Sequence, residues 1–504
     1  MDAPVPLILA ALLAAAALVA PTPRARAAGM VGALVLAPVI LGWHIAGSDQ
    51  LRPLRDHPAV AVALAAIGLV ALAALAVLFD RRPTWLPIAA AAALPFRVPI
   101  ASGGSTANLL LPLYLVVAAG ALAYAVPRLA GRERAEGGRA RAGVVEWALA
   151  AYLVLYAAQA WGSIDFGHAL ENVVFFYVPF ALLFALVSRV AWTPRLARVC
   201  LGVLAVLALA LVGVGFVEYA TRHLFLNPKV IASNQLGSYF RVNSLFFDPN
   251  IYGRFLALVM VLLSAWMLWA RRRVEVAGAV ALLAVLWAGL VLTFSQSSFT
   301  ALLLGLALLG ALRWSVRWAL GLSAAGLAVA IAIVMVAPGA VHLDLGSSRS
   351  ADKATSGRYA LVRGGVRLFE SAPVIGHGSG SFPREYRRAE HVSAERSTSA
   401  SHTIPVTIAA EQGVVGLAAY LLLLGAALGR LFWRARGVPE RAAVAVAFTA
   451  LVAHTMMYAA FLEDPLTWTL LGVGTALALW PAPGRRAPAP GDAAAPAEPA
   501  PARA

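Results

Sequence analysis

The sequence predicts an all-α fold, namely a polytopic integral membrane protein built as a bundle of transmembrane helices. Of its 504 residues, 61% are hydrophobic and only 13% are charged, and the mean hydropathy is +0.79. A soluble domain with this composition would not stay in solution. Apolar runs close to the ~20 residues that cross a bilayer recur along the chain. We therefore expect one transmembrane domain, residues 1–480, with about 12–15 helices.

The apolar runs give the expected spans in order. The first is interpreted as uncleaved, because Asp2 stands where a signal peptide would carry basic residues. The fourth contains Pro87 and Pro95 and is expected to be broken or re-entrant. The expected spans are 5–20, 28–46, 59–79, 85–100, 109–126, 144–161, 169–187, 196–217, 251–270, 274–294, 298–312, 318–337, 404–428, 442–461 and 466–480.

The net charge of +16 comes from arginines that cluster in short connections between the spans. This distribution is typical of orientation signals, so we exclude nucleic acid as a partner. If every span crosses, the basic connections share one side, which is then the cytoplasm. Two long loops, 218–250 and 338–403, lie outside. Residues 481–504 are rich in Ala and Pro and are expected to form a disordered cytoplasmic tail.

The end of the first long loop carries candidate binding residues. Asp248-Pro249-Asn250 predicts the start of a helix, because Asp or Asn caps free amides and Pro restricts the backbone. Arg241 lies just before this turn. It is either an anchor at the membrane interface or a side chain that grips a phosphate through two parallel hydrogen bonds.

The second long loop is rich in arginines, among them Arg358 and Arg363, and a loop of this length in a membrane protein is usually functional. Gly376 and Gly378 lie in its glycine-rich middle. Such a turn either brings backbone amides close to a ligand or only reverses the chain.

This loop closes at His402, and Glu411 follows near the start of the next span. A neutral histidine accepts a proton at neutral pH, because its ordinary pKa is ~6.5. His402 is therefore a candidate general base for a hydroxyl acceptor. A hydrogen-bonded histidine at the membrane interface is the alternative.

The other polar residues indicate no further chemistry. The remaining histidines lack metal-ligand spacing and Cys200 is the single cysteine, so neither a metal nor another cofactor is expected. A Walker pattern is absent, which argues against nucleotide hydrolysis. The polar run 293–298 is typical of helix packing through hydroxyls. Glu463 and Asp464 are expected to pair with arginines or to face water.

Ordered signatures between residues 241 and 420 resemble the O-antigen ligase and polymerase superfamily of bacterial envelope proteins. They are RVNSLFFDPN at 241–250, LTFSQSS at 292–298, SGRY at 356–359, PVIGHGSGSF at 373–382, and His402 before EQGVVG at 411–416. Members of this family often carry arginine after the hairpin serine, where this chain has Gln296.

The resemblance implies a GT-C-type glycosyltransferase in the bacterial inner (cytoplasmic) membrane. It would transfer or polymerise glycan from an undecaprenyl-diphosphate-linked donor on the outer face, onto a glycan, lipid or protein acceptor, without a metal ion. Arg241 and Arg358 would hold the diphosphate, and His402 would activate the acceptor hydroxyl. The residues in support would be Asp248, Asn250, Arg363, Gly376, Gly378 and Glu411.

Two other function classes remain open from the sequence. One is a transporter or flippase of an anionic or lipid-linked substrate, which we favour less because the interiors of the spans are almost uncharged. The other is a receptor that binds glycan through the external loops without turnover.

Overall fold

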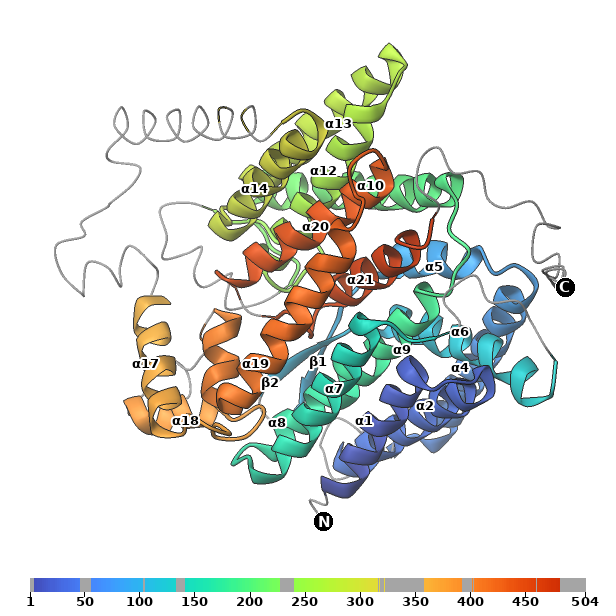
Figure 1. The fold of residues 1–504 in the computed structure, drawn as a ribbon, viewed down its shortest axis with the longest axis vertical. Helices are drawn as coiled ribbons and strands as arrows, with labels where there is room; N and C mark the ends of the chain where they lie inside the picture. The colour runs from blue at the N-terminus through green and yellow to red at the C-terminus, as the bar shows by residue number, and fades with distance from the viewer. Residues whose placement is uncertain are drawn as a thin grey trace, which may run out of the picture.

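The computed structural model describes residues 4–45, 56–102, 105–132, 141–226, 240–315, 317, 321, 358–391 and 401–480, apart from 402 and 459. Within these ranges the chain forms a bundle of α-helices (Figure 1), which confirms the predicted all-α fold class. Ten described helices are long and apolar enough to cross a membrane, and Pro4–Val19 and Pro465–Leu477 are shorter apolar helices. Almost all of the expected span 318–337, and all of the tail 481–504, lie outside the described residues.

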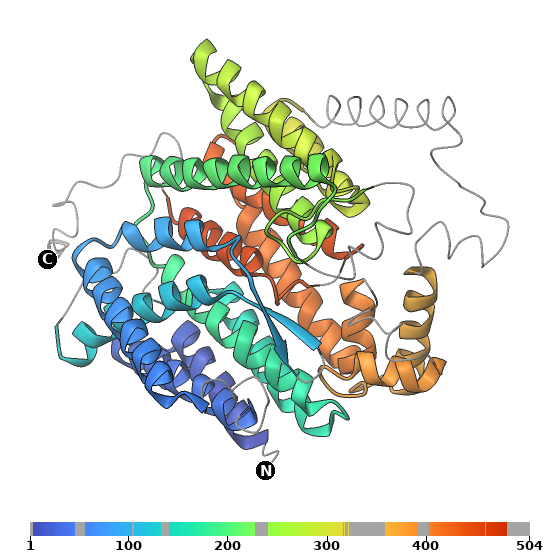
Figure 2. The ribbon, with the colours of Figure 1, turned by 180° about the vertical axis from the view of Figure 1, so that it is seen from behind.

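The helices of the first half agree with the expected spans to within a few residues. They are α1 (Pro4–Val19), α2 (Pro23–Ile45), α4 (Pro58–Arg81), α6 (Leu111–Leu129), α7 (Val144–Gln159) and α10 (Pro194–Thr221). Helices α1, α2 and α7 pack side by side (Figure 1), and α10 lies next to α5 (Figure 2). Small residues let them approach closely, because a Cβ on Gly29 of α2 would lie 2.8 Å from the carbonyl oxygen of Leu13 in α1.

The expected span 169–187 is a helix with a wide turn inside it. Helix α8 (Phe166–Glu171), a π-helical turn (Asn172–Tyr177) and α9 (Val178–Val187) follow one another without a break. Pro179 explains the wide turn, because proline has no N–H and displaces the carbonyl four residues earlier. Every described side chain of α9 except Pro179 is buried, so this helix lies at the centre of the bundle.

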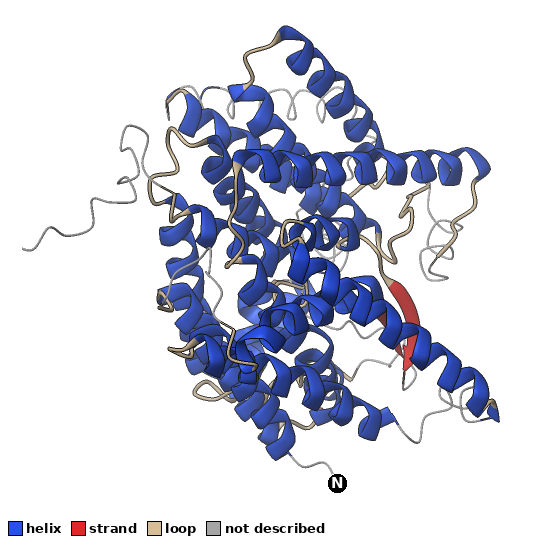
Figure 3. Ribbon diagram, turned by 90° about the vertical axis from the view of Figure 1, so that its right-hand side faces the viewer, coloured by secondary structure: helices blue, strands red, loops and turns tan. Residues whose placement is uncertain are grey.

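The expected span 85–100 is broken, as its prolines predicted. Helix α5 ends at Ala93 (Trp85–Ala93), and the chain continues into a two-stranded antiparallel hairpin of β1 (Val98–Ser102) and β2 (Ser105–Leu109). These strands, red in Figure 3, are an addition to the all-helical prediction. Arg97 lies between α5 and β1, at the point where the helix gives way to extended chain.

The second half is built around α12. Its helices are α12 (Pro249–Trp269), α13 (Arg273–Val291), α14 (Gln296–Arg313), α17 (Arg358–Ser371), α18 (Phe382–Glu390), α19 (Ile404–Phe432), α20 (Pro439–Thr455) and α21 (Pro465–Leu477). Helix α12 contacts α10, α13, α14 and α20, so most of its side chains are buried. Helices α17 and α18 lie beside the beginning of α19 (Figure 1) and fold part of the expected long loop 338–403.

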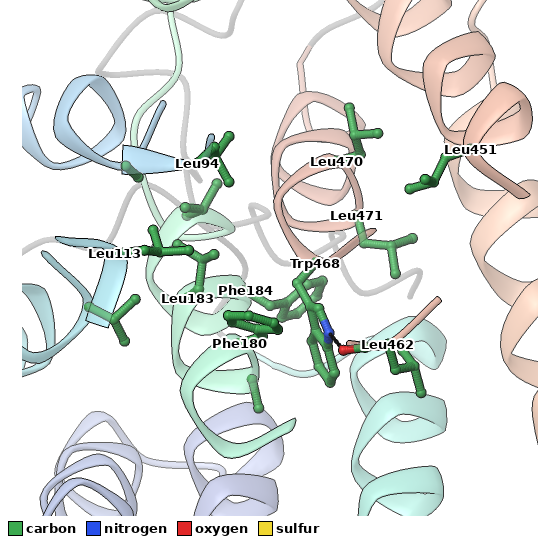
Figure 4. Close-up of a cluster of buried hydrophobic side chains, with 14 of the residues drawn as sticks. Leu94, Leu113, Phe180, Leu183, Phe184, Leu451, Leu462, Trp468, Leu470 and Leu471 are labelled. Atoms are coloured by element: carbon green, nitrogen blue, oxygen red, sulfur yellow. Dashed lines mark hydrogen bonds between the residues drawn. The ribbon is translucent and has the colours of Figure 1, made fainter. Parts of the chain in front are cut away.

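An apolar cluster holds the connection between α20 and α21 in place (Figure 4). Phe180 and Phe184 of α9 lie beside Trp468 of α21, and all three side chains are almost completely buried. The indole N–H of Trp468 donates a hydrogen bond of 2.9 Å to the carbonyl oxygen of Leu462. The core thereby fixes the short connection that carries Glu463 and Asp464.

Candidate functional site

Residues 240–250 are fastened to α10 by a buried carboxylate. Glu218 of α10 accepts hydrogen bonds from the backbone N–H groups of Asn243 (3.2 Å) and Ser244 (2.7 Å). Ser244 has a positive φ of 51°, and its hydroxyl donates to the carbonyl oxygen of Leu211 at 2.7 Å. The described end of the first long loop is therefore a fixed platform at the start of α12.

Asp248 starts α12, as the sequence predicted. Its Oδ1 accepts a hydrogen bond of 2.6 Å from the backbone N–H of Asn250, and Pro249 occupies the first turn. Asp248 also accepts a hydrogen bond from Tyr458, which follows α20. The cap therefore joins α12 to the connection before α21.

Arg241 binds the groups on either side of it. Its Nε donates to the carbonyl oxygen of Thr293 at 2.9 Å, and its Nη2 donates to Oδ1 of Asn250 at 3.3 Å. Arg241 is half-buried and connects the platform to the hairpin between α13 and α14. Asn250 thus positions Arg241, a job that the helix-start pattern alone did not indicate.

Three serines in the polar run after α13 form a buried cluster of hydroxyl groups next to His454. Oγ of Ser295 lies 2.8 Å from Oγ of Ser298, and Nε2 of His454 lies 3.0 Å from Oγ of Ser297 and 3.2 Å from Oγ of Ser298. This agrees with the predicted packing through hydroxyls. Gln296 is exposed. His454 was not assigned from the sequence, because its partners lie far away along the chain.

Two arginines and one aspartate meet where α12, α21 and the α5–β1 connection converge. Nη1 of Arg254 lies 2.9 Å from Oδ2 of Asp464, and Nη2 of Arg97 lies 3.9 Å from Oδ1 of the same carboxylate. The side chains of Arg254 and Asp464 are each 1% exposed, and that of Arg97 is 10% exposed. Of the two alternatives for Asp464, the structure shows the pairing with arginine.

Arg254 also corrects an expectation. It lies inside the expected span 251–270, whose interior should have been almost uncharged, and it is fully buried. It is tolerated there because it pairs with Asp464 and donates to the carbonyl oxygen of Ala460 at 2.7 Å. The lack of deep charges therefore no longer argues against a transporter.

Glu463 adds a buried carboxyl beside this cluster. Its Oε1 accepts a hydrogen bond of 3.0 Å from the hydroxyl of Tyr177. Burial raises the pKa of the Glu463 carboxyl above its ordinary value, and the hydrogen bond from Tyr177 only partly offsets this effect. Glu463 therefore gives up its proton less readily than an exposed glutamate does.

The glycine-rich turn is seated on α19. Glu411 accepts hydrogen bonds from the backbone N–H groups of Gly380 (2.9 Å) and Phe382 (3.1 Å), and Gly378 N–H donates to the carbonyl oxygen of Glu411 at 2.8 Å. Gly376 and Gly378 have positive φ angles of 69° and 94°. Glu411 therefore holds the turn against α19.

Gly376→Ala is expected to destabilise the protein by about 1–3 kcal/mol or more. The positive φ disfavours a side chain there, and the added Cβ would lie 2.3 Å from the carbonyl oxygen of Glu411. Thermal unfolding in detergent measures the effect. Gly425→Ala in α19 is the control, because nothing lies within 4 Å of its added Cβ. Equal unfolding temperatures for the two variants would contradict this role of Gly376.

The remaining candidate residues surround the beginning of α19. Arg358 is the first residue of α17, and Arg363 in the same helix is exposed. His402 lies outside the described residues, but its neighbour Thr403 donates a hydrogen bond of 3.1 Å from Oγ1 to the carbonyl oxygen of Met456. Helix α17 packs here as well, because a Cβ on Gly365 would contact Val406.

The structure thus brings several of the predicted segments together. Arg241, Asp248 and Asn250 join the serine hairpin and the end of α20, and Thr403 reaches the same end of α20. The seat of the glycine-rich turn lies further along α19. Sequence reasoning missed Arg97 and Arg254, because a single arginine in an apolar run does not reveal its distant partner.

Comparison with known proteins gives one finding that bears on this site. Residues 281–421 match the family model described as O-antigen ligase. The match runs from α13 into α19 and covers the serine hairpin, Arg358 and the glycine-rich turn, whereas Arg241 precedes it. It confirms the resemblance predicted from the ordered signatures. No curated protein matches the chain.

Proposed function

We propose that this protein, whose residues 281–421 match the O-antigen ligase family model, is a glycosyltransferase that takes glycan from an undecaprenyl-diphosphate-linked donor. The reaction takes place on the outer face of the bacterial inner membrane, and the acceptor is a glycan, a lipid or a protein. One observation supports this proposal most strongly. The platform with Arg241 and the chain beside His402 reach the same end of α20, through Asp248–Tyr458 and Thr403–Met456.

The proposed reaction is a displacement at the anomeric carbon. The acceptor hydroxyl oxygen forms a bond to this carbon while the bond from the carbon to the diphosphate oxygen breaks. His402 takes the hydroxyl proton, and the electron pair leaves with the lipid diphosphate. Arg241 and Arg358 hold the charge that grows on the leaving group, and no metal ion is needed for this step.

The supporting residues have separate tasks in this proposal. Asn250 and Asp248 hold Arg241 and the start of α12, while Glu411 seats the turn that contains Gly376 and Gly378. Arg363 is exposed on α17 and adds positive charge for the approach of an anionic donor.

Deletion of this protein is expected to change the envelope glycan, and the kind of change identifies the reaction. Loss of a ligase leaves long unattached polymer on its lipid carrier, whereas loss of a polymerase leaves single repeat units attached. Gel analysis of glycan from the deletion strain separates the two. The wild-type chain should restore the original pattern, and the His402→Ala chain at equal membrane level should not. An unchanged glycan in the deletion strain would contradict the proposed function.

A further inference from the structure

The cluster of Arg97, Arg254 and Asp464 has more positive than negative charge. Two guanidinium groups share one carboxylate, and Asp464 is closer to Arg254 (2.9 Å) than to Arg97 (3.9 Å). Burying a charge is expensive unless an opposite charge pairs with it. Arg97 is therefore only weakly paired with Asp464. A weakly paired arginine beside a complete ion pair is typical of a site that binds an anion.

The hydrogen-bonding groups of these arginines are incompletely used. Nε and Nη2 of Arg254, and Nε of Arg97, are buried and have no hydrogen-bond acceptor among the described residues. Such unsatisfied donors are costly in a protein interior. A phosphate oxygen is a suitable acceptor, because guanidinium groups bind phosphate through parallel charge-assisted hydrogen bonds.

An apolar cavity of about 170 Å³ lies along helices that also carry or adjoin this cluster, although none of the three cluster residues lines it. Helices α5, α10, α12, α20 and α21 contribute to its wall, and its lining includes Leu94, Leu204, Leu262, Leu470 and Val473. Its lining is mostly apolar, with charged side chains only at Arg198 and Glu440. Such a lining suits a hydrocarbon chain.

The lining residues nearest to the cluster lie a few residues from it along the chain. Leu94 at the cavity lies three residues before Arg97, and Thr469 at the cavity lies five residues after Asp464, about 7–8 Å along the chain of α21. From Thr469 to Leu477 the lining extends a further ~12 Å along α21. A ligand with a charged head and a long apolar tail matches both parts.

We propose that Arg97 and Arg254 bind the diphosphate of the lipid-linked donor in addition to Arg241 and Arg358, and that the cavity between α5, α12 and α21 holds part of its isoprenoid chain. This inference rests on the proposed function for the identity of the donor. Arg97 supplies a cation from the first half of the chain. The rest of the isoprenoid chain extends into the bilayer.

Binding measurements on the purified full chain in detergent test the two parts separately. Undecaprenyl diphosphate and inorganic diphosphate are the probes. Arg97→Ala is expected to weaken binding of both probes by about tenfold or more, because it removes charge-assisted hydrogen bonds to the head group. Val473→Trp fills the cavity and is expected to weaken only the lipid probe, by roughly tenfold.

Matched controls exclude general effects of charge and size. Arg384→Ala removes an arginine that pairs with Asp165 but is 53% exposed, and Leu303→Trp enlarges a side chain that is 58% exposed on α14. Both should bind the two probes like the wild type. Arg97→Lys should recover part of the affinity if charge matters. It also replaces Arg97→Ala as the test variant if Arg97→Ala does not fold.

Wild-type affinity of Arg97→Ala for both probes would overturn the head-group assignment, and wild-type affinity of Val473→Trp for the lipid probe would overturn the cavity assignment. Equal weakening of both probes by Val473→Trp would also contradict the cavity assignment, because a general distortion would explain it. If the binding results are as expected but the wild-type protein forms no glycosidic bond, the proposed function fails while the lipid-diphosphate site stands.

Discussion

Arg241→Ala is expected to reduce glycan transfer by about a hundredfold to a thousandfold, the usual effect of removing a group that stabilises charge on a leaving group. Arg241 is held by Asn250 and by the carbonyl oxygen of Thr293, so its guanidinium is in place before the donor arrives. Initial rates of product formation with purified protein and a lipid-linked donor measure the effect.

Arg241→Lys distinguishes this role from simple anchoring. Lysine keeps the charge and can still reach the membrane interface, but it lacks the planar pair of donors that grips a phosphate. We expect Arg241→Lys to recover little of the rate. Full activity of Arg241→Lys, or of Arg241→Ala at equal protein level, would assign Arg241 to anchoring and remove it from the reaction.

Asp464→Asn is expected to destabilise the fold by ~3–5 kcal/mol, because it removes the carboxylate that forms ion pairs with both arginines. Asparagine can still accept the hydrogen bond from the backbone N–H of Leu466 that caps α21, so the change isolates the charge. Thermal unfolding in detergent, without added lipid or diphosphate, gives the free-energy change.

Two comparisons sharpen this prediction. Glu390→Gln breaks the more exposed pair with Arg367 and should change stability by less than ~1 kcal/mol. Combining Asp464→Asn with Arg97→Gln should recover part of the loss, since only one buried arginine is then unpaired. If Asp464→Asn were no more destabilising than Glu390→Gln, the aspartate would not be needed to balance the arginines.

Most of the fold follows from hydropathy, because the bilayer requires long apolar helices whatever their neighbours are. The wide turn before Pro179 and the break after α5 also have local causes in proline. The β1–β2 hairpin was not foreseen. The Gly103-Gly104 pair between the strands is a two-residue hairpin pattern, but the apolar run before it was interpreted as one span up to Ile100.

The candidate site was predictable only where a short segment contains a recognisable local sequence pattern. Asp248 caps the helix that follows it, so a short pattern was enough. Arg254, Asp464 and Arg97 come from three distant segments, and only packing brings them together. His454 and Ser298 meet in the same way. Glu411 was expected only near the start of its span, and its hydrogen bonds to the backbone N–H groups of Gly380 and Phe382 again depend on packing between distant segments.

The most direct measurement is reconstitution of the purified protein in liposomes with an undecaprenyl-diphosphate-linked glycan and candidate acceptors. We expect a new glycosidic bond between donor glycan and acceptor, together with release of undecaprenyl diphosphate. Movement of the intact donor across the bilayer, with no new glycosidic bond under any acceptor, would contradict a transferase and indicate a transporter.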